Sequence, residues 1–383
     1  MLPISYAIRN LFRVPARCVQ IVLGAALVIV LLMLASALSD GMDAVLRSSG
    51  SERNIILLGS GSEDSVERSE VNAAVPALVA ASVPGIKTVL GRAAVSGEIH
   101  YNGFLTPAGG AERRQALLRG VTPAALLVHP EVRLIEGTFP RSGEAMVGRL
   151  ATHKMRLPDD SLKVGDEIQV GDTKLTISGI FQAPGTVMEA EVWTDLGDML
   201  AIAQRDTISC AVVRLGKAEF GDVEVFTLQR LDLELVALRE SEYYAKLSAF
   251  YTPLRAMTWV TAALVAAGAV FGGLNTLYAA FSSRIREMAT LQAVGFKRPA
   301  LLLSLLQESL LATMLGATIA AAFAMWVADG ITVPFSIGTF VIDISPSVLS
   351  IGPAGGLVLA IVGALPPAWT CLRPKLPVAL RSS

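Results

Sequence analysis

The chain has 383 residues, of which 52% are hydrophobic, 17% are charged and 6% are aromatic. An average soluble domain has roughly a quarter of its residues charged, so this composition excludes a disordered chain and argues against a purely soluble enzyme. The formal net charge is only -1, from 32 basic and 33 acidic residues, which excludes a global positive field that would select nucleic acid. The composition therefore indicates a membrane protein that does not bind nucleic acid.

Four segments are apolar enough to cross the lipid bilayer, which takes about 20 consecutive apolar residues. They are residues 18–39, 256–283, 299–328 and 344–372, and the only charged residue among them is Glu308. The region 40–255 between the first two segments is polar and mixed, and it is long enough to bury a core of its own. We therefore predict a membrane protein of four transmembrane α-helices with a large extracytoplasmic α+β domain between spans one and two.

Basic residues set the predicted orientation, because Lys and Arg accumulate on the cytoplasmic side. They are concentrated in an amphipathic amino-terminal segment (1–17), in the loop 284–298 and in the tail 373–383. The loop 329–343 contains Asp329 and Asp343 and no basic residue. Both termini and the loop 284–298 should therefore face the cytoplasm, with 40–255 and 329–343 outside.

One alternative concerns the first span. Ala35-Ser36-Ala37 resembles a signal-peptide cleavage site after a basic amino-terminal stretch. The apolar run is longer than a typical signal sequence, and its removal would leave an odd number of spans. We favour an uncleaved first span.

The outer domain shows a mixed pattern of elements. Gly171-Asp172 between two alternating segments is typical of a two-residue β-hairpin turn. The remaining pattern predicts a strand at 54–58, a helix at 71–83, strand at 86–101, the hairpin within 164–181, and helices at 193–204 and 226–247. We expect the last helix to continue without a break into the second span.

Catalytic motifs are absent from the sequence. The three histidines, His100, His129 and His153, have neither HExxH nor HxH spacing, and no G-x-S-x-G or phosphate-binding P-loop motif occurs. Three scattered cysteines (Cys18, Cys210 and Cys371) provide no disulfide framework or CxxC metal site. We therefore expect no catalytic residue, no metal and no cofactor in this chain, which argues against a membrane-anchored enzyme, and no intramolecular disulfide.

The loop between spans two and three has helical periodicity. Apolar residues recur at Ile285, Met288, Leu291 and Val294, and Gly295 is placed to cap the helix. Two interpretations remain open from the residues alone. The helix lies on the membrane interface, held by its arginines, or it enters a groove on a soluble partner.

This loop carries a family resemblance. The pattern R-x-x-E-[IM]-A-x-L-x-A-x-G-x-x-[RK], after a span with an asparagine, resembles the signature of FtsX/MacB-type ABC transporter permeases, which include the LolC/LolE pair. Segments 7–13, 366–368 and 376–381 also resemble the family's ends, and 137–145, 165–168 and 177–181 resemble its MacB-type periplasmic core. The loop match runs through Asn275, Arg284, Glu287, Met288, Ala289, Leu291, Ala293, Gly295 and Arg298, and continues to Glu308 and Gly316.

The resemblance implies a permease of the type VII, mechanotransmission superfamily in the inner membrane of a bacterium. Such a permease pairs with a second copy or a paralogue, and with two copies of an ABC ATP-binding subunit that holds ATP and Mg²⁺. ATP hydrolysis by that subunit would move the outer domain and drive export or extraction of a substrate at the outer face. A membrane-fusion or other periplasmic protein is a further implied partner. The alternative is a non-transporting transmitter that activates a periplasmic enzyme or sensor, as in the FtsX branch.

The resemblance also suggests roles for individual residues. In the coupling helix, the stripe of Ile285, Met288 and Leu291 would enter a groove of the ATPase. Arg284, Glu287 and Arg298 would fix its register, with Gly295 as the cap.

The intramembrane polar residues have structural interpretations. We expect Glu308 to hydrogen-bond between helices or to pair with a basic residue near the cytoplasmic boundary, because a lone charge in hydrocarbon is costly. Glu287 should brace the coupling helix through Arg284 or a partner base. Asn275 should hydrogen-bond across helices. Pro366-Pro367 should kink or end the fourth span.

Overall fold

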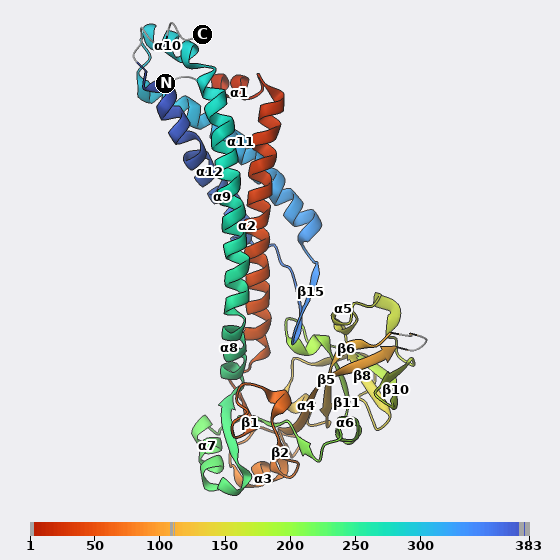
Figure 1. Cartoon of the computed structure of the whole chain (residues 1–383). Coiled ribbons are helices and arrows are strands. Elements are labelled where there is room, and N and C mark those ends of the chain that lie inside the picture. The colour runs from red at the N-terminus through yellow and green to blue at the C-terminus, as the bar shows by residue number, and fades with distance from the viewer. Residues whose placement is uncertain (1–3, 108–109, 111, 375–378, 380–383) are drawn as a thin grey trace. The chain divides into compact units, whose positions relative to one another are not determined.

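The computed structural model describes residues 4–107, 110, 112–374 and 379. It divides into two compact units (Figure 1). We call Met1–Asp40, Pro253–Ile331 and Ile342–Ser383 the membrane unit, and Gly41–Thr252 with Thr332–Val341 the outer unit. The carboxyl-terminal motif at 376–381 lies outside the described residues, apart from Ala379.

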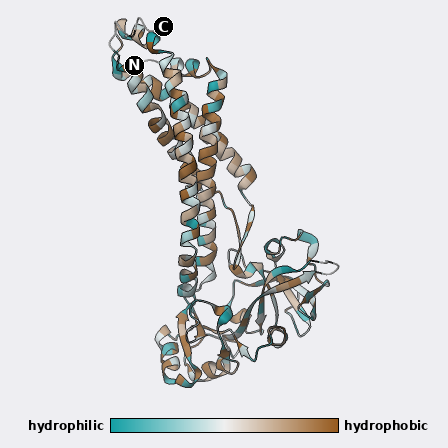
Figure 2. Ribbon diagram, viewed as in Figure 1, coloured by the Kyte–Doolittle hydropathy of each residue, from teal (hydrophilic) through white to brown (hydrophobic). Residues whose placement is uncertain are grey.

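Four helices of the structure are long and apolar enough to span a membrane, which confirms the predicted number within the described residues. Apolar residues dominate their length, as Figure 2 shows. They are α2 (Pro15–Ser49), α9 (Thr252–Ser282), α11 (Arg298–Phe323), which continues as a π-helical turn over Ala324–Ala328, and α12 (Pro346–Leu372).

Two prolines do not end the fourth span. Of the two predicted effects of Pro366-Pro367, an end of the span is excluded because α12 continues to Leu372, and a kink stays a prediction. A proline in a helix removes one backbone donor. The Thr370 hydroxyl donates to the carbonyl oxygens of Pro366 (3.1 Å) and Pro367 (2.9 Å) in the following turn.

Two short helices complete the membrane unit, α1 (Ile4–Leu11) and α10 (Ile285–Ala293). The long helices approach closely where α11 carries Gly316. A Cβ atom there would lie 2.8 Å from the carbonyl oxygen of Val22 on α2. Only glycine fits this contact without displacing backbone.

The outer unit is built on a ten-stranded sheet in the order β14-β1-β13-β5-β6-β11-β8-β10-β7, with β9 beside β10 and β5. Two short pairs, β2 with β12 and β3 with β4, lie outside it. The bounds are β1 Asn54–Gly59, β2 Val71–Asn72, β3 Thr88–Val89, β4 Arg92–Ala93, β5 Val95–Pro107, β6 Arg114–Val121, β7 Arg133–Gly137, β8 Glu144–Gly148, β9 Glu167–Val170, β10 Thr173–Gln182, β11 Glu191–Asp195, β12 Thr207–Ile208, β13 Cys210–Arg214 and β14 Leu235–Arg239.

The long strand β5 joins the two halves of this sheet. Its first residues pair with β13, where Glu98 lies opposite Cys210, and its later residues pair with β6, where Ile99 lies opposite Gly120. Alternate residues of a strand point to the same face. Glu98 and His100 therefore share one face of the sheet, next to Cys210.

Six α-helices accompany the sheet within the described residues of the outer unit. The largest buried side chains of the unit include Trp193 and Phe181. These two aromatic rings lie 5.1 Å apart between centroids. The helices are α3 Val75–Ser82, α4 Ala125–Val128, α5 Ala151–Lys154, α6 Leu196–Ala203, α7 Phe220–Gln229 and α8 Glu240–Phe250.

The predicted strand at 54–58 and the predicted hairpin are confirmed. Val170 pairs with Thr173, and Gly171 takes the positive φ of +59° that such a turn requires. A strand also forms within 86–101, as β5 and two short neighbours.

Three predicted helices are wrong in extent. Residues 71–72 are a strand before α3, and Trp193 lies in β11 before α6. Residues 226–247 are not one helix, because β14 separates α7 from α8 and pairs with β1 over Ile55–Gly59. The predicted unbroken run into the second span is therefore wrong. Pairing to a neighbouring strand overrides helical periodicity here.

The outer loop between spans three and four forms an unpredicted hairpin, β15 (Thr332–Phe335) and β16 (Gly338–Val341), which belongs to the outer unit. The Lys154 ammonium at the end of α5 donates to the carbonyl oxygens of Phe335 and Ser336, the latter at 2.9 Å. A residue far away in the sequence thus holds the hairpin tip.

Candidate functional site

The loop helix α10 ends in the predicted glycine cap. Gly295 has a φ of +109°, which other residues adopt at a cost. Its N–H donates to the carbonyl of Gln292 (3.0 Å), and the N–H of Phe296 donates to the carbonyl of Leu291 (3.1 Å). This pair of hydrogen bonds is a Schellman motif. It sets the direction in which the chain enters α11.

The apolar stripe of α10 packs inside the membrane unit. Met288 is only 2% exposed and joins a cluster with Phe281 of α9 and Leu301 of α11, against which Ile285 and Leu291 are partly buried. The prediction that this stripe enters a groove of a partner is therefore wrong. Short connections hold α10 beside α9 and α11, so its apolar side chains are buried within the chain itself.

The opposite face of α10 is the one that solvent or a partner can reach. Val294 is 74% exposed. We call this face the coupling surface; it comprises the exposed residues Arg286, Thr290, Ala293, Val294 and Lys297. Arg298, at the start of α11, is exposed and contacts Gln292 at 3.5 Å.

An ionic cluster connects α10 to two spanning helices. Arg284 donates to Glu308 of α11 (2.8 Å) and lies 3.5 Å from Glu287, while Arg17 of α2 donates to the other oxygen of Glu308 (3.1 Å). Tyr6 of α1 donates to Glu287 (3.1 Å). The predicted ion pair of Glu308 and the predicted bracing of Glu287 by Arg284 are both confirmed as contacts. Arg284 is itself buried, so its contacts are internal.

The spanning helix α9 exposes its polar residue. Asn275 is exposed, and its side chain makes no hydrogen bond to the residues that the structure describes. The predicted bond across helices is therefore wrong within this chain. Gly272 and Gly268 lie one and two turns before Thr276, and a Cβ atom on either glycine would meet nothing within 4 Å. An exposed amide beside small residues is typical of a helix that packs against another membrane helix.

The outer unit holds a second, wholly buried polar site. The Arg119 guanidinium of β6 donates two hydrogen bonds to Glu191 of β11 (2.8 and 2.7 Å) and one to Glu98 of β5 (2.8 Å). His129, at the end of α4, lies 3.0 Å from the other oxygen of Glu98 through Nε2. All four residues are at most 5% exposed.

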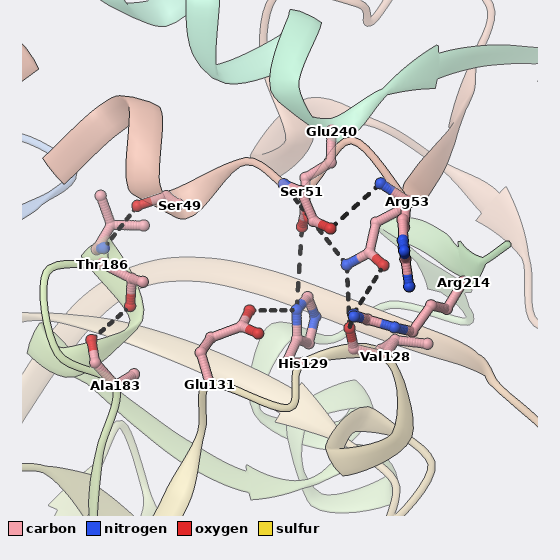
Figure 3. Close-up of polar contacts among 12 residues, drawn as sticks. Ser49, Ser51, Arg53, Val128, His129, Glu131, Ala183, Thr186, Arg214 and Glu240 are labelled. Atoms are coloured by element: carbon pink, nitrogen blue, oxygen red, sulfur yellow. Dashed lines mark hydrogen bonds and ion pairs between the residues drawn. The ribbon is translucent and has the colours of Figure 1, made fainter. Parts of the chain in front are cut away.

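This site extends to the ends of two helices, as Figure 3 shows. Glu240, the first residue of α8, accepts hydrogen bonds from the Asn54 amide (2.9 Å) and from the backbone N–H of Ser51 (3.0 Å), just after α2. The His129 Nδ1 atom lies 3.9 Å from Glu240 and 3.5 Å from Glu131. The chain segments after α2 and before α8 are therefore tied to the centre of the sheet.

Burial and the neighbouring charged groups shift the pKa values of the side chains in this site. Burial opposes a charge on His129, but the Glu98 carboxylate and hydrogen bonding to Glu131 and Glu98 raise the pKa of His129 to about 10. Burial likewise disfavours the Glu98 carboxylate, yet the neighbouring His129, His100 and Arg119 hold the pKa of Glu98 well below its usual value. Burial raises the pKa of Glu240. The sequence analysis missed this network, because its members have no motif spacing.

One group among the described residues combines side chains that bind metals. Glu98, His100 and Cys210 each offer one ligand atom, and these atoms lie within 4.8 Å of one another. Cys210 is a buried free thiol, as are Cys18 and Cys371.

Comparisons with known proteins cover most of the chain. The model of the MacB-like periplasmic core domain matches residues 20–219, and that of the FtsX-like permease C-terminal domain matches residues 259–375. No curated protein matches the chain.

Three solved structures are similar to about half of this chain at low identity. The periplasmic region of MacB from Actinobacillus actinomycetemcomitans is 10% identical (TM-score 0.40), covering 53% of this chain and 95% of that one. The extracellular domain of the noncanonic ABC-type transporter YknZ from Gram-positive bacteria is 12% identical (TM-score 0.36), covering 48% and 99%. A domain of a putative permease protein from Porphyromonas gingivalis is 15% identical (TM-score 0.34), covering 49% and 87%.

The first family model alone spans just over half of the chain, and the second covers the last three spans and the loop with α10. Four spanning helices with a large domain between the first two agree with that assignment. This chain belongs to the FtsX/MacB-type family of ABC transporter permeases and is a multi-pass membrane permease subunit.

Proposed function

We propose that this permease transmits ATP-driven motion from a separate ATP-binding subunit to its own outer unit, in order to export or extract a substrate at the outer face of a bacterial inner membrane. ATP and Mg²⁺ are held by that subunit, in two copies, and both termini of the permease are cytoplasmic. Its resemblance to the mechanotransmission permeases motivates this proposal. The substrate passes or leaves at the outer unit, and this chain performs no chemistry.

The coupling surface of α10 is the observation that carries the proposal. An exposed valine between Thr290 and Lys297 on a short, capped helix is suited to a groove on a soluble protein. The buried face of the same helix is joined to α11 through Arg284 and Glu308 and to α2 through Arg17. A push on α10 would therefore reach two spanning helices through direct contacts.

A second permease copy, or a paralogue, would cover the exposed face of α9. The amide of Asn275 and the open space around Gly268 and Gly272 support this partner. In lipid, close packing of small residues and interhelical hydrogen bonds drive helix association. The exposed amide would find its partner there.

The test replaces Val294 by Asp. A carboxylate placed in a contact with the ATPase would be desolvated without a partner, which costs about 2–5 kcal/mol. We expect Val294→Asp to lose copurification with the ATP-binding subunit that accompanies the wild-type chain, and to lose stimulation of ATP hydrolysis. Membrane insertion should be unchanged, because Val294 is exposed.

The matched control is Val225→Asp, the same change at a half-exposed valine of α7 in the outer unit. Val225→Asp should copurify with the ATP-binding subunit and stimulate its ATP hydrolysis as the wild-type chain does. A Val294→Asp chain with normal assembly and ATP turnover would show that α10 is not the coupling element. Met288→Asp would be a poor probe, because it places a charge in the core of the permease itself.

A further inference from the structure

Three metal-ligand side chains lie on one face of the outer-unit sheet. Glu98 and His100 alternate along β5, and Cys210 of β13 lies directly opposite Glu98. The backbone N–H of His100 also donates to the Ser209 hydroxyl (3.1 Å), which holds the two strands together at this point. Two strands therefore present a carboxylate, an imidazole and a thiol to one small volume.

The spacing of these groups suits a tetrahedral ion. Zinc binds such ligands at about 2.0–2.3 Å, which places neighbouring ligand atoms about 3.3–3.8 Å apart. The His100 Nε2 and Glu98 Oε2 atoms are 3.7 Å apart, and all three ligand atoms lie within 4.8 Å of one another.

The carboxylate is oriented by a second layer of hydrogen bonds. Its Oε1 atom faces His129 Nε2 at 3.0 Å, and its Oε2 atom accepts from Arg119 at 2.8 Å. Each carboxylate oxygen can accept more than one partner. The positive charge of Arg119 is matched by Glu191, to which it donates twice. Metal ligands in proteins are held by outer contacts of this kind.

A cavity borders one of the three ligands. It has a volume of about 180 Å³ and is lined by His100, Arg119, Glu191 and Tyr244, among others. The His100 side chain is 18% exposed, whereas that of Glu98 is fully buried. An ion bound beside His100 would have room on the cavity side for water as a fourth ligand.

From this arrangement we propose that Glu98, His100 and Cys210 form a binding site for a zinc-class transition-metal ion in the outer unit. A thiolate with an imidazole selects such an ion over Mg²⁺ or Ca²⁺, which prefer oxygen ligands. The fourth position, on the cavity side, is left for water or a small ligand. The sequence analysis expected no metal in this chain, and the proposal revises that expectation.

Cobalt(II) is the probe, because it takes zinc sites and gives a near-ultraviolet charge-transfer band when a thiolate binds it. The full chain in detergent is stripped with a chelator and titrated with Co²⁺. We expect one Co²⁺ per chain, a thiolate band, and loss of the band when Zn²⁺ is added. Zn²⁺ should also raise the unfolding temperature of the wild-type chain, since a ligand that binds the folded state stabilises it.

Variants separate this site from the other thiols. Cys210→Ser should lose the band, while the double variant Cys18→Ser/Cys371→Ser should keep it. His129→Gln should keep the band with metal affinity reduced about 10–100-fold, because His129 acts through Glu98. His100→Ala, at the partly exposed ligand, should remove the Zn²⁺-dependent rise in unfolding temperature.

Two results would overturn the proposal. One is the absence of a thiolate band from the wild-type chain at saturating Co²⁺. The other is a band that persists in Cys210→Ser, or that disappears in the double variant, since it would then arise from another thiol. The unfolding temperature of metal-free Cys210→Ser, compared with the metal-free wild-type chain, shows whether the variant is folded. If it is not, the His100→Ala comparison decides the proposal instead.

Discussion

Glu308 lies inside a predicted span, and two arginines from distant parts of the chain contact its carboxylate. Arg284 and Arg17 each contact one of its oxygens, and its side chain is only 8% exposed. A buried charge is tolerated when it is paired and hydrogen-bonded. The residue therefore joins α2 and α11 to the start of α10, and its position requires no role in proton or substrate handling.

Removing this charge should weaken the membrane unit. Glu308→Gln leaves two arginines without their carboxylate, and breaking a buried ion pair costs about 3–5 kcal/mol. We expect a clear fall in the unfolding temperature of the full chain in detergent. Glu287→Gln, at a side chain that is 35% exposed, should cost less than about 1 kcal/mol. Equal unfolding temperatures for the two variants would refute this interpretation of Glu308.

The buried charges of the outer unit are also paired and hydrogen-bonded, in a larger network than that around Glu308. Arg119 serves two carboxylates, and Trp193 donates to one of them, Glu191, at 2.7 Å. Burying each of these groups costs little free energy only because the other groups are present to pair with it. Such a network sets the relative positions of β5, β6 and β11 more narrowly than apolar packing alone would.

Among the elements, α10 depends on the geometry of its carboxyl-terminal end. Gly295 reverses the chain so that Phe296 and Leu291 meet the same apolar cluster. Three of the four predicted stripe residues, Ile285, Met288 and Leu291, lie on the side of α10 that packs within the chain, whereas Val294 is exposed. The stripe was assigned to a partner because a period identifies apolar positions without identifying what covers them.

Substitutions at two glycines, one in the cap and one as a control, test the cap at Gly295. Gly295→Ala forces a side chain into a left-handed conformation at a cost of about 1–2 kcal/mol, so amide exchange in 285–296 should accelerate about 5–30-fold. Gly221→Ala is the control, because Gly221 lies in α7 with ordinary φ and nothing within 4 Å of its Cβ position. Alanine there should stabilise α7 by about 0.5–1 kcal/mol. Unchanged exchange in 285–296 would show that the cap does not hold α10.

At the scale of the whole molecule, the chain is organised as a membrane unit and an outer unit that each draw on distant segments. The outer unit takes in the β15–β16 hairpin from the loop between spans three and four, held in part by Lys154. That loop is therefore placed on the same side of the membrane as residues 41–252.

Topology can be checked with reporter cysteines. Ser60→Cys and Ser336→Cys should react with an impermeant thiol reagent from outside, as should a reporter at residue 200, whereas Ser5→Cys and Thr290→Cys should react only after the membrane is opened. A reporter at residue 380, outside the described residues, should behave like the last two. The native cysteines are buried and provide a low background. Labelling of Ser336→Cys only from the cytoplasmic side would contradict the four-span arrangement.

The sequence by itself determined the four spans, the large outer domain and the family. The bilayer requires one unbroken apolar run per span, and the loop signature is contiguous, so both can be read from neighbouring residues. The Gly295 cap and the hairpin at Gly171-Asp172 were predictable for the same reason, since each depends on a few consecutive residues.

Only the tertiary structure decided which groups meet across the chain. Strand pairing brings Cys210 beside Glu98, and helix packing brings Arg17 and Arg284 to Glu308. Residues 235–239 form the strand β14 because they pair with β1, which is distant in the sequence. The burial of Met288 and the exposure of Val294 follow from the neighbours of α10. Contacts of this kind depend on which surfaces pack together, and a local pattern cannot specify its partner.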